Sequence, residues 1–121
     1  MKKSNEYRVV FHLEQPDPQR LHIAVNNTAN LIADKGMAVQ AAFVANFKAP
    51  QLFLAGESGT EWAETAAQLV NRGILTIYLC KNSLKSLHLA PESLLPFCKI
   101  VPAGISRIIE LQNEGFAYIK P

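Results

Sequence analysis

Short apolar stretches alternate with longer segments of helical periodicity along this sequence, and this alternation restricts the folds open to it. The apolar, β-branched and aromatic stretch at residues 7–13, YRVVFHL, is typical of a buried strand. Further strands are expected at residues 38–45, 73–79, 98–101 and 116–119. Strands that alternate with helices of about 10–15 residues predict a mainly parallel sheet covered on both faces. We therefore expect one α/β domain over residues 1–121, with a loose tail at residues 1–6.

Start and stop signals mark the helices between these strands. Asp17 followed by Pro18 suits an N-cap and a first helical position, and this helix is expected to end at Lys35-Gly36. Ser58 and Glu61 have the spacing of a capping box.

The second and last helices have similar endings. The second is expected to end near Arg72-Gly73, and the last to start at residues 102–104 and end at Gly115. Between residues 80 and 97 we expect a loop, with a short helix after Pro91.

Composition and motif content argue against several functional classes. A net charge of +2 without a basic stripe argues against nucleic-acid binding. No apolar run approaches the roughly 18 residues of a membrane span, and the polar N-terminus does not resemble a secretory signal, so we expect a cytoplasmic protein with reduced cysteines. The sequence contains neither GxGxxG nor GxxxxGK[ST], which argues against a dinucleotide or P-loop site.

Cys80 is the leading candidate for chemistry because it closes the third expected strand and opens a polar segment. Ligands of open α/β sheets bind beyond the carboxyl ends of the strands. Free N–H groups at a helix start capped by Asn82 or Ser83, with the neighbouring Lys81 ammonium, would favour thiolate over thiol. A thiolate can attack a sulfur atom or carry one as a persulfide. The alternative is a small buried cysteine that serves packing alone.

His12 and Lys48 are weaker candidates at the same edge of the sheet. His12 ends the first strand, where it either reaches the crevice or is simply a hydrogen-bonded histidine. Lys48 lies in the loop after the second strand, where a cation can attract an anion. The histidines at 12, 22 and 88 share no ligand spacing with each other or with the cysteines, so no metal site is expected.

Cys98 and the apolar loop residues have structural interpretations. Cys98 begins a strand whereas Cys80 ends one, so the two sulfurs are expected to lie too far apart for a disulfide. Residues 52–54, LFL, and Trp62 either contact another subunit or pack beneath their own loop.

Several segments together resemble the DsrE/DsrF-like proteins of intracellular sulfur metabolism. They are FHL, VNNTANLIADKG, AVQAAFVA, NRGILTIYLCKNSL and VPAGISRIIELQNEGFAYIKP, in that order along the chain. The resemblance implies a three-layer α/β/α domain with a parallel five-stranded sheet of order 4-3-2-1-5. It also implies a homo-oligomer, either a trimer or a hexamer, and it places Cys80 where some members accept and pass on sulfur.

One segment departs from this resemblance. Relatives often carry a glycine-containing histidine motif after the second strand, whereas residues 46–50 here read NFKAP. Ligand contacts that relatives make through this loop are therefore not expected of residues 46–59 in this chain. The favoured hypothesis is a sulfur carrier that forms a persulfide on Cys80, helped by Lys81, Asn82, Ser83, His12 and Lys48, with donor and acceptor proteins as partners and no cofactor. The alternative is a non-catalytic ligand-binding or assembly module.

Overall fold

Five parallel strands form one sheet in the computed structural model, which describes residues 7–56 and 60–121. The strands are β1 (Tyr7–Leu13), β2 (Val39–Ala45), β3 (Leu75–Cys80), β4 (Cys98–Val101) and β5 (Ala117–Ile119). The α-helices are α1 (Pro18–Lys35), α2 (Thr60–Asn71), α3 (Lys81–Leu87) and α4 (Gly104–Asn113). Short 3-10 helices cover η1 (Gly36–Ala38), η2 (Ala49–Phe53) and η3 (Pro91–Ser93).

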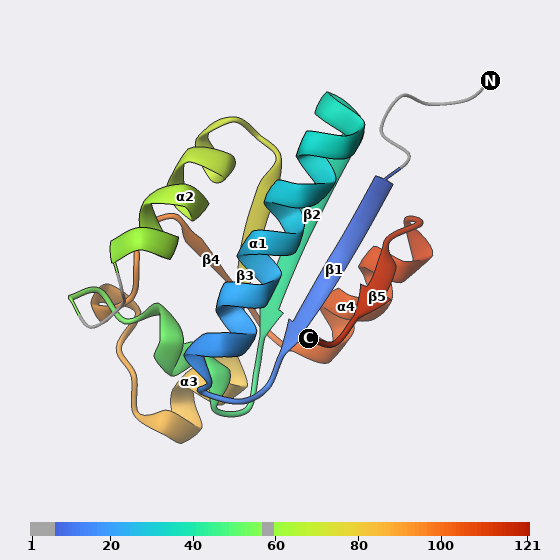
Figure 1. The fold of residues 1–121 in the computed structure, drawn as a ribbon. Helices are drawn as coiled ribbons and strands as arrows, with labels where there is room; N and C mark the ends of the chain where they lie inside the picture. Colours follow the sequence, from blue (N-terminus) through green and yellow to red (C-terminus); the bar gives the residue numbers. More distant parts are fainter. Residues whose placement is uncertain (1–6, 57–59) are drawn as a thin grey trace.

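The strand order is β4-β3-β2-β1-β5, and every neighbouring pair is parallel. The first strand, β1, therefore lies next to the edge of the sheet; the chain builds through β2 and β3 to β4 at one edge and returns to the other with β5 beside β1. This arrangement brings the carboxyl ends of the strands to one edge of the sheet, where α3 lies (Figure 1). It confirms the expected order 4-3-2-1-5 and the three-layer α/β/α class.

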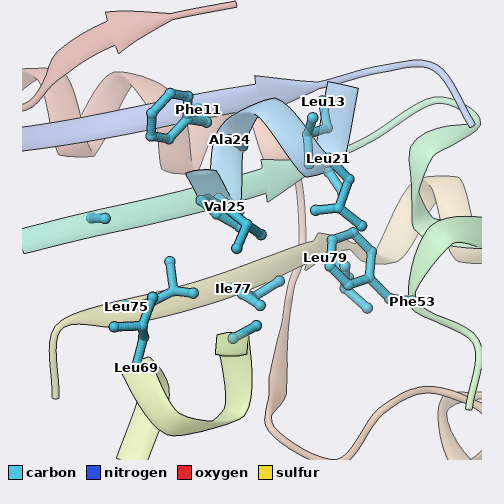
Figure 2. Packing of buried hydrophobic residues seen from close by; sticks show 14 of the residues in the cluster. Phe11, Leu13, Leu21, Ala24, Val25, Phe53, Leu69, Leu75, Ile77 and Leu79 are labelled. Carbon is cyan, nitrogen blue, oxygen red and sulfur yellow. The ribbon is translucent and has the colours of Figure 1, made fainter. Parts of the chain in front are cut away.

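One face of the sheet carries the larger core. Alternate residues of the inner strands point to this face, where they pack against α1, α2 and the loop that contains Phe53 (Figure 2). Phe53 is fully buried and meets Trp62 edge-on, with ring centroids 5.5 Å apart. The structure thus shows Phe53 and Trp62 packed against each other within the chain, and contact of this segment with another subunit stays a prediction.

The other face is covered more sparsely. Ile108 and Leu111 of α4 pack there on Val10, Ala42 and Val44 in a second, smaller cluster. Among the described residues, no helix is both long and apolar enough to cross a membrane.

The expected element boundaries hold to within two residues for most of the described chain. Asp17 caps α1 by accepting from the Gln19 N–H at 3.0 Å, and Gly36 ends that helix, as expected. The expected tail at 1–6 and the capping box that begins at Ser58 lie outside the described residues.

The expectation was wrong for the segment after the third strand. β3 continues through Cys80, and α3 begins at the next residue, whereas a loop with a short helix start at Asn82 or Ser83 was expected. Cys80 itself is the N-cap residue, not Asn82 or Ser83, because the chain passes from strand to helix without an intervening turn.

Candidate functional site

Cys80 lies at the carboxyl edge of the sheet, between the starts of two helices. It ends β3 and precedes α3, and its Cβ lies 3.4 Å from the place where a side chain on Gly104, the first residue of α4, would begin. Side chains alternate along a strand, so Cys80 shares its face with Tyr78, on the side of the sheet that α4 covers. Only 6% of the residue is exposed, so a visiting molecule meets a small part of it.

The surroundings of the Cys80 sulfur favour its anion. Desolvation by burial raises the pKa of the thiol, which is the largest single effect. The Ser83 hydroxyl and the backbone N–H groups of Gly104, Ser83 and Asn82 act in the opposite direction, and their combined effect leaves the pKa below its ordinary value of 9.0. The neutral thiol makes no side-chain capping hydrogen bond to α3, whereas a thiolate is a strong acceptor for these donors.

Ser83 is oriented by the loop after β2. Its Oγ accepts a hydrogen bond from the Phe47 N–H at 2.8 Å, which occupies an acceptor position and leaves the hydroxyl proton for the sulfur. Phe47 adopts a left-handed backbone conformation with φ of 55°. A non-glycine residue in this region stores a modest amount of strain, a feature concentrated at functional sites.

Gly104 allows α4 to approach the sulfur. A Cβ at this position would lie 3.2 Å from the Asn46 Cβ and 3.3 Å from the Val44 Cγ1, besides 3.4 Å from the Cys80 Cβ. Two of these atoms are Cβ atoms fixed directly to the backbone, so they cannot turn aside as the end of a flexible side chain can. Glycine is therefore the residue that lets the N–H at the start of α4 reach Cys80.

His12 joins the surroundings of the site through Asn46. It is 7% exposed, and its Nε2 lies 2.9 Å from the Asn46 Oδ1 while its Nδ1 lies 2.6 Å from the Tyr118 hydroxyl. Both ring nitrogens are thus occupied, which matches the hydrogen-bonded alternative for His12. The contact that links His12 to the residues around Cys80 is its hydrogen bond with Asn46.

An ion pair between Glu14 and Lys120 lies beside the His12 ring. Glu14 Oε2 lies 3.7 Å from His12 Nε2, and Glu14 Oε1 pairs with the Lys120 ammonium at 2.5 Å. The hydrogen bond from Lys120, which outweighs desolvation, lowers the pKa of Glu14. The carboxylate is therefore held ionised near the imidazole.

The two lysines of the hypothesis lie on the surface around the site. Lys81 is exposed and lines a cavity of about 530 Å³ between α3 and the end of β4. Lys48 is exposed, with its Nζ 5.5 Å from the centre of the Phe47 ring. Neither ammonium is among the groups that shift the pKa of Cys80, so the backbone and Ser83 account for the lowered value.

Cys98 lies in a different environment. It pairs with Ile77, three residues before Cys80 on β3, and both cysteines are free. It packs against the larger core, and desolvation by burial raises the pKa of its thiol to about 12. Among the described residues no group of three or more His, Cys, Asp or Glu side chains is placed to hold a metal ion.

Asn46 and Gly104 are the site residues that sequence reasoning missed. Asn46 follows β2 directly and continues the alternation of Ala42 and Val44, a pattern that places it on the face of Cys80. Gly104 follows a proline and an alanine after a strand, which reads locally as an ordinary helix start. Nothing local to Gly104 indicates that it approaches residue 80.

Comparison with known proteins agrees with the fold. The model of the DsrE/DsrF-like family matches residues 18–121. A solved protein of unknown function from Methanobacterium thermoautotrophicum is similar, with 30% identity and a TM-score of 0.82, over 95% of this chain and 99% of that one. No curated protein matches the sequence.

Proposed function

This chain belongs to the DsrE/DsrF-like family, and we propose that it carries sulfur as a persulfide on Cys80. Membership points to sulfur-relay chemistry in general terms. The observation that carries the specific proposal is the set of donors around Cys80, from Ser83, Asn82 and Gly104, which lowers the pKa of its thiol despite desolvation. A packing cysteine needs no such donors, as Cys98 illustrates.

The proposed step is a transfer of sulfane sulfur between two thiols. The Cys80 thiolate attacks the outer sulfur of a donor persulfide, R–S–SH, and forms a new S–S bond. The donor's S–S bond breaks, and its electron pair leaves on the donor as R–S⁻, which takes up a proton. The Cys80 sulfur is thereby oxidised by the same amount as the donor sulfur is reduced, so no cofactor is needed. Delivery to an acceptor thiol repeats the exchange in the opposite sense.

The same donors assist both directions of this exchange. They favour the attacking thiolate during loading, and they stabilise Cys80 as a leaving group during delivery, because a thiol of lower pKa leaves faster. Asn82 contributes through its backbone N–H, and Ser83 through its N–H and hydroxyl. Lys81 and Lys48 are proposed to attract an anionic donor or acceptor to this edge of the sheet.

Intact-mass spectrometry after incubation with a small persulfide donor tests the proposal. We expect the wild-type chain to gain the mass of one sulfur atom, removable by a reducing thiol. The Cys98→Ser variant should gain it equally, since the elevated pKa keeps Cys98 protonated at neutral pH. The proposal fails if no adduct forms, or if Cys80→Ser accepts sulfur as readily as the wild type.

The small exposed fraction of Cys80 favours the second candidate, a non-catalytic assembly or ligand-binding module in which this thiol only packs. The rate of Cys80 alkylation as a function of pH separates the two. Rapid alkylation below about pH 7 requires an appreciable thiolate fraction and supports the carrier. A rate that rises only near the ordinary thiol pKa supports the packing interpretation.

We also propose that the chain forms a homo-oligomer, a trimer or a hexamer. Support comes from α4, whose Ile105 and Ile109 are 57% and 53% exposed and lie one helical turn apart. Apolar side chains exposed in this way on one helix are typical of subunit contacts.

A further inference from the structure

Asn46 is the polar side chain that the sheet brings alongside Cys80. The ladder between β2 and β3 ends at the pair Ala45 and Leu79, so Asn46 and Cys80 are the next residues along each chain segment. The vacant Cβ position of Gly104 lies 3.2 Å from the Asn46 Cβ and 3.4 Å from the Cys80 Cβ. The two Cβ atoms are therefore no more than about 6.6 Å apart, which is the sum of those distances.

The Asn46 amide has a defined orientation. Its Oδ1 faces His12 Nε2 at 2.9 Å, and the Glu14 carboxylate 3.7 Å from the same nitrogen favours a proton there. His12 Nδ1 then accepts from the Tyr118 hydroxyl at 2.6 Å. With its oxygen bonded to His12, Asn46 turns its N–H2 group away from the imidazole.

The unloaded Cys80 sulfur has its own set of donors. The groups that lower the pKa of Cys80 are the Ser83 hydroxyl and three backbone N–H groups, and Asn46 is not among them. A persulfide adds a second sulfur about 2.05 Å farther out. The outer sulfur therefore occupies a position different from that of the first, where a further donor beside Cys80 can act on it.

We propose that the Asn46 N–H2 group donates to the outer sulfur of the Cys80 persulfide, with His12 as the residue that positions the amide. This inference rests on the proposed function. The group that the amide would bind is the terminal sulfur of the persulfide in its anionic form. The bond that it describes exists only in the loaded protein. The site thus has two sets of donors: Ser83 and the backbone N–H groups for the thiolate, and the Asn46 amide for the outer sulfur of the persulfide.

Comparison of the free and loaded states of Asn46→Ala tests the inference. We expect the pH profile of Cys80 alkylation in the free protein to stay within about two-fold of wild type. After loading with a small persulfide, the sulfur adduct should disappear about ten-fold faster in this variant, by intact mass, since a hydrogen bond to a charged group is removed. Asn30→Ala, an exposed asparagine on α1, is the matched control and should keep the wild-type lifetime.

His12→Phe provides a second variant that leaves Asn46 in place. It removes the hydrogen bond that orients the amide, so the adduct should again be shorter-lived, while the free thiol keeps its pH profile. If the wild type loads sulfur but both variants hold it for the wild-type time, the inference is overturned and the carrier proposal stands. If the wild type does not load Cys80, the carrier proposal itself is overturned. If Asn46→Ala does not fold, by circular dichroism, the His12→Phe lifetime alone decides.

Discussion

At the scale of single residues, two cysteines on neighbouring strands have opposite acid–base properties. Donors around Cys80 outweigh its desolvation and lower the pKa of its thiol, whereas Cys98 meets desolvation alone and its pKa rises to about 12. The difference arises from position along the strands. Cys80 lies at the edge where helices begin, and Cys98 lies three residues back along the ladder, against the core.

This contrast predicts opposite pH dependence of the free energy of unfolding. The folded chain loses the Cys80 proton before the unfolded chain does. The stability that Cys80 contributes is therefore complete above its unfolded pKa, near 9.0, and is lost as the pH falls through its lower folded pKa. For Cys98 the unfolded chain loses its proton first, so above pH 9.0 the wild type should lose up to about 1.4 kcal/mol per pH unit relative to Cys98→Ser.

Urea unfolding of the wild type, Cys80→Ser and Cys98→Ser from about pH 7 to about pH 10 measures both effects. The difference between wild type and Cys80→Ser should grow in favour of the wild type as the pH rises toward 9.0. Parallel curves for the wild type and Cys80→Ser would show that the Cys80 pKa is the same in both states.

At the scale of elements, α4 can start close to the sheet because its first residue, Gly104, has no side chain. Gly104 is the first residue of this helix, and its backbone is not in the left-handed region, so conformational freedom does not explain it. Glycine is explained instead by the close approach of this position to Asn46, Val44 and Cys80. An N–H group at a helix start carries a partial positive charge, so this approach favours the thiolate.

Gly104→Ala and Gly104→Pro test that role. Alanine usually stabilises a helix by about 0.5–1 kcal/mol over glycine. Here we expect no gain or a loss, together with slower Cys80 alkylation at neutral pH, because the added Cβ moves α4 away from the sulfur. Proline suits a first helical position but lacks the N–H, so its alkylation rate should fall below that of the alanine variant.

Thermal unfolding and alkylation rates measured together distinguish this effect from general damage. An alanine variant that is more stable than wild type, with an unchanged alkylation profile, would contradict a role for the close approach. Ser106→Ala, an exposed position in the first turn of α4, is a control that should leave the profile unchanged.

At the scale of the whole molecule, the two faces of the sheet are covered unequally. The larger core lies under α1 and α2, while α4 alone packs the opposite cluster (Figure 1). The outer side of α4 carries exposed Ile105 and Ile109. The proposed subunit contact lies there, close in the chain to Gly104 and therefore near Cys80.

Ile109→Lys should shift the chain toward monomers, because a buried ammonium without a partner opposes association. Size-exclusion chromatography with light scattering measures the molar mass. Ile23→Lys is the matched control, since Ile23 is an isoleucine of α1 that is 44% exposed. The proposed contact is refuted if the wild type is monomeric, or if Ile109→Lys keeps the wild-type mass.

The sequence by itself determined the elements and their order. The strand at 7–13, the cap at Asp17 and the short strand at 98–101 follow from signals within a few residues of each other: apolar runs, a capping side chain, a proline or a glycine. The start of α3 was expected too late, at Asn82 or Ser83, because this helix of seven residues follows the strand directly and has no side-chain cap. A short helix without a capping side chain has a local sequence pattern that a loop can share.

The tertiary structure alone decided which residues surround Cys80. Residues 12, 46 and 104 are far apart in the chain, and they converge because parallel strands end at one edge and α4 starts above it. The same arrangement brings Tyr118 and Asn46 to His12. It also gives Cys80 hydrogen-bond donors while Cys98 has none that lowers its pKa. Burial and hydrogen bonding depend on neighbours from distant segments, and no local pattern in the sequence specifies those neighbours.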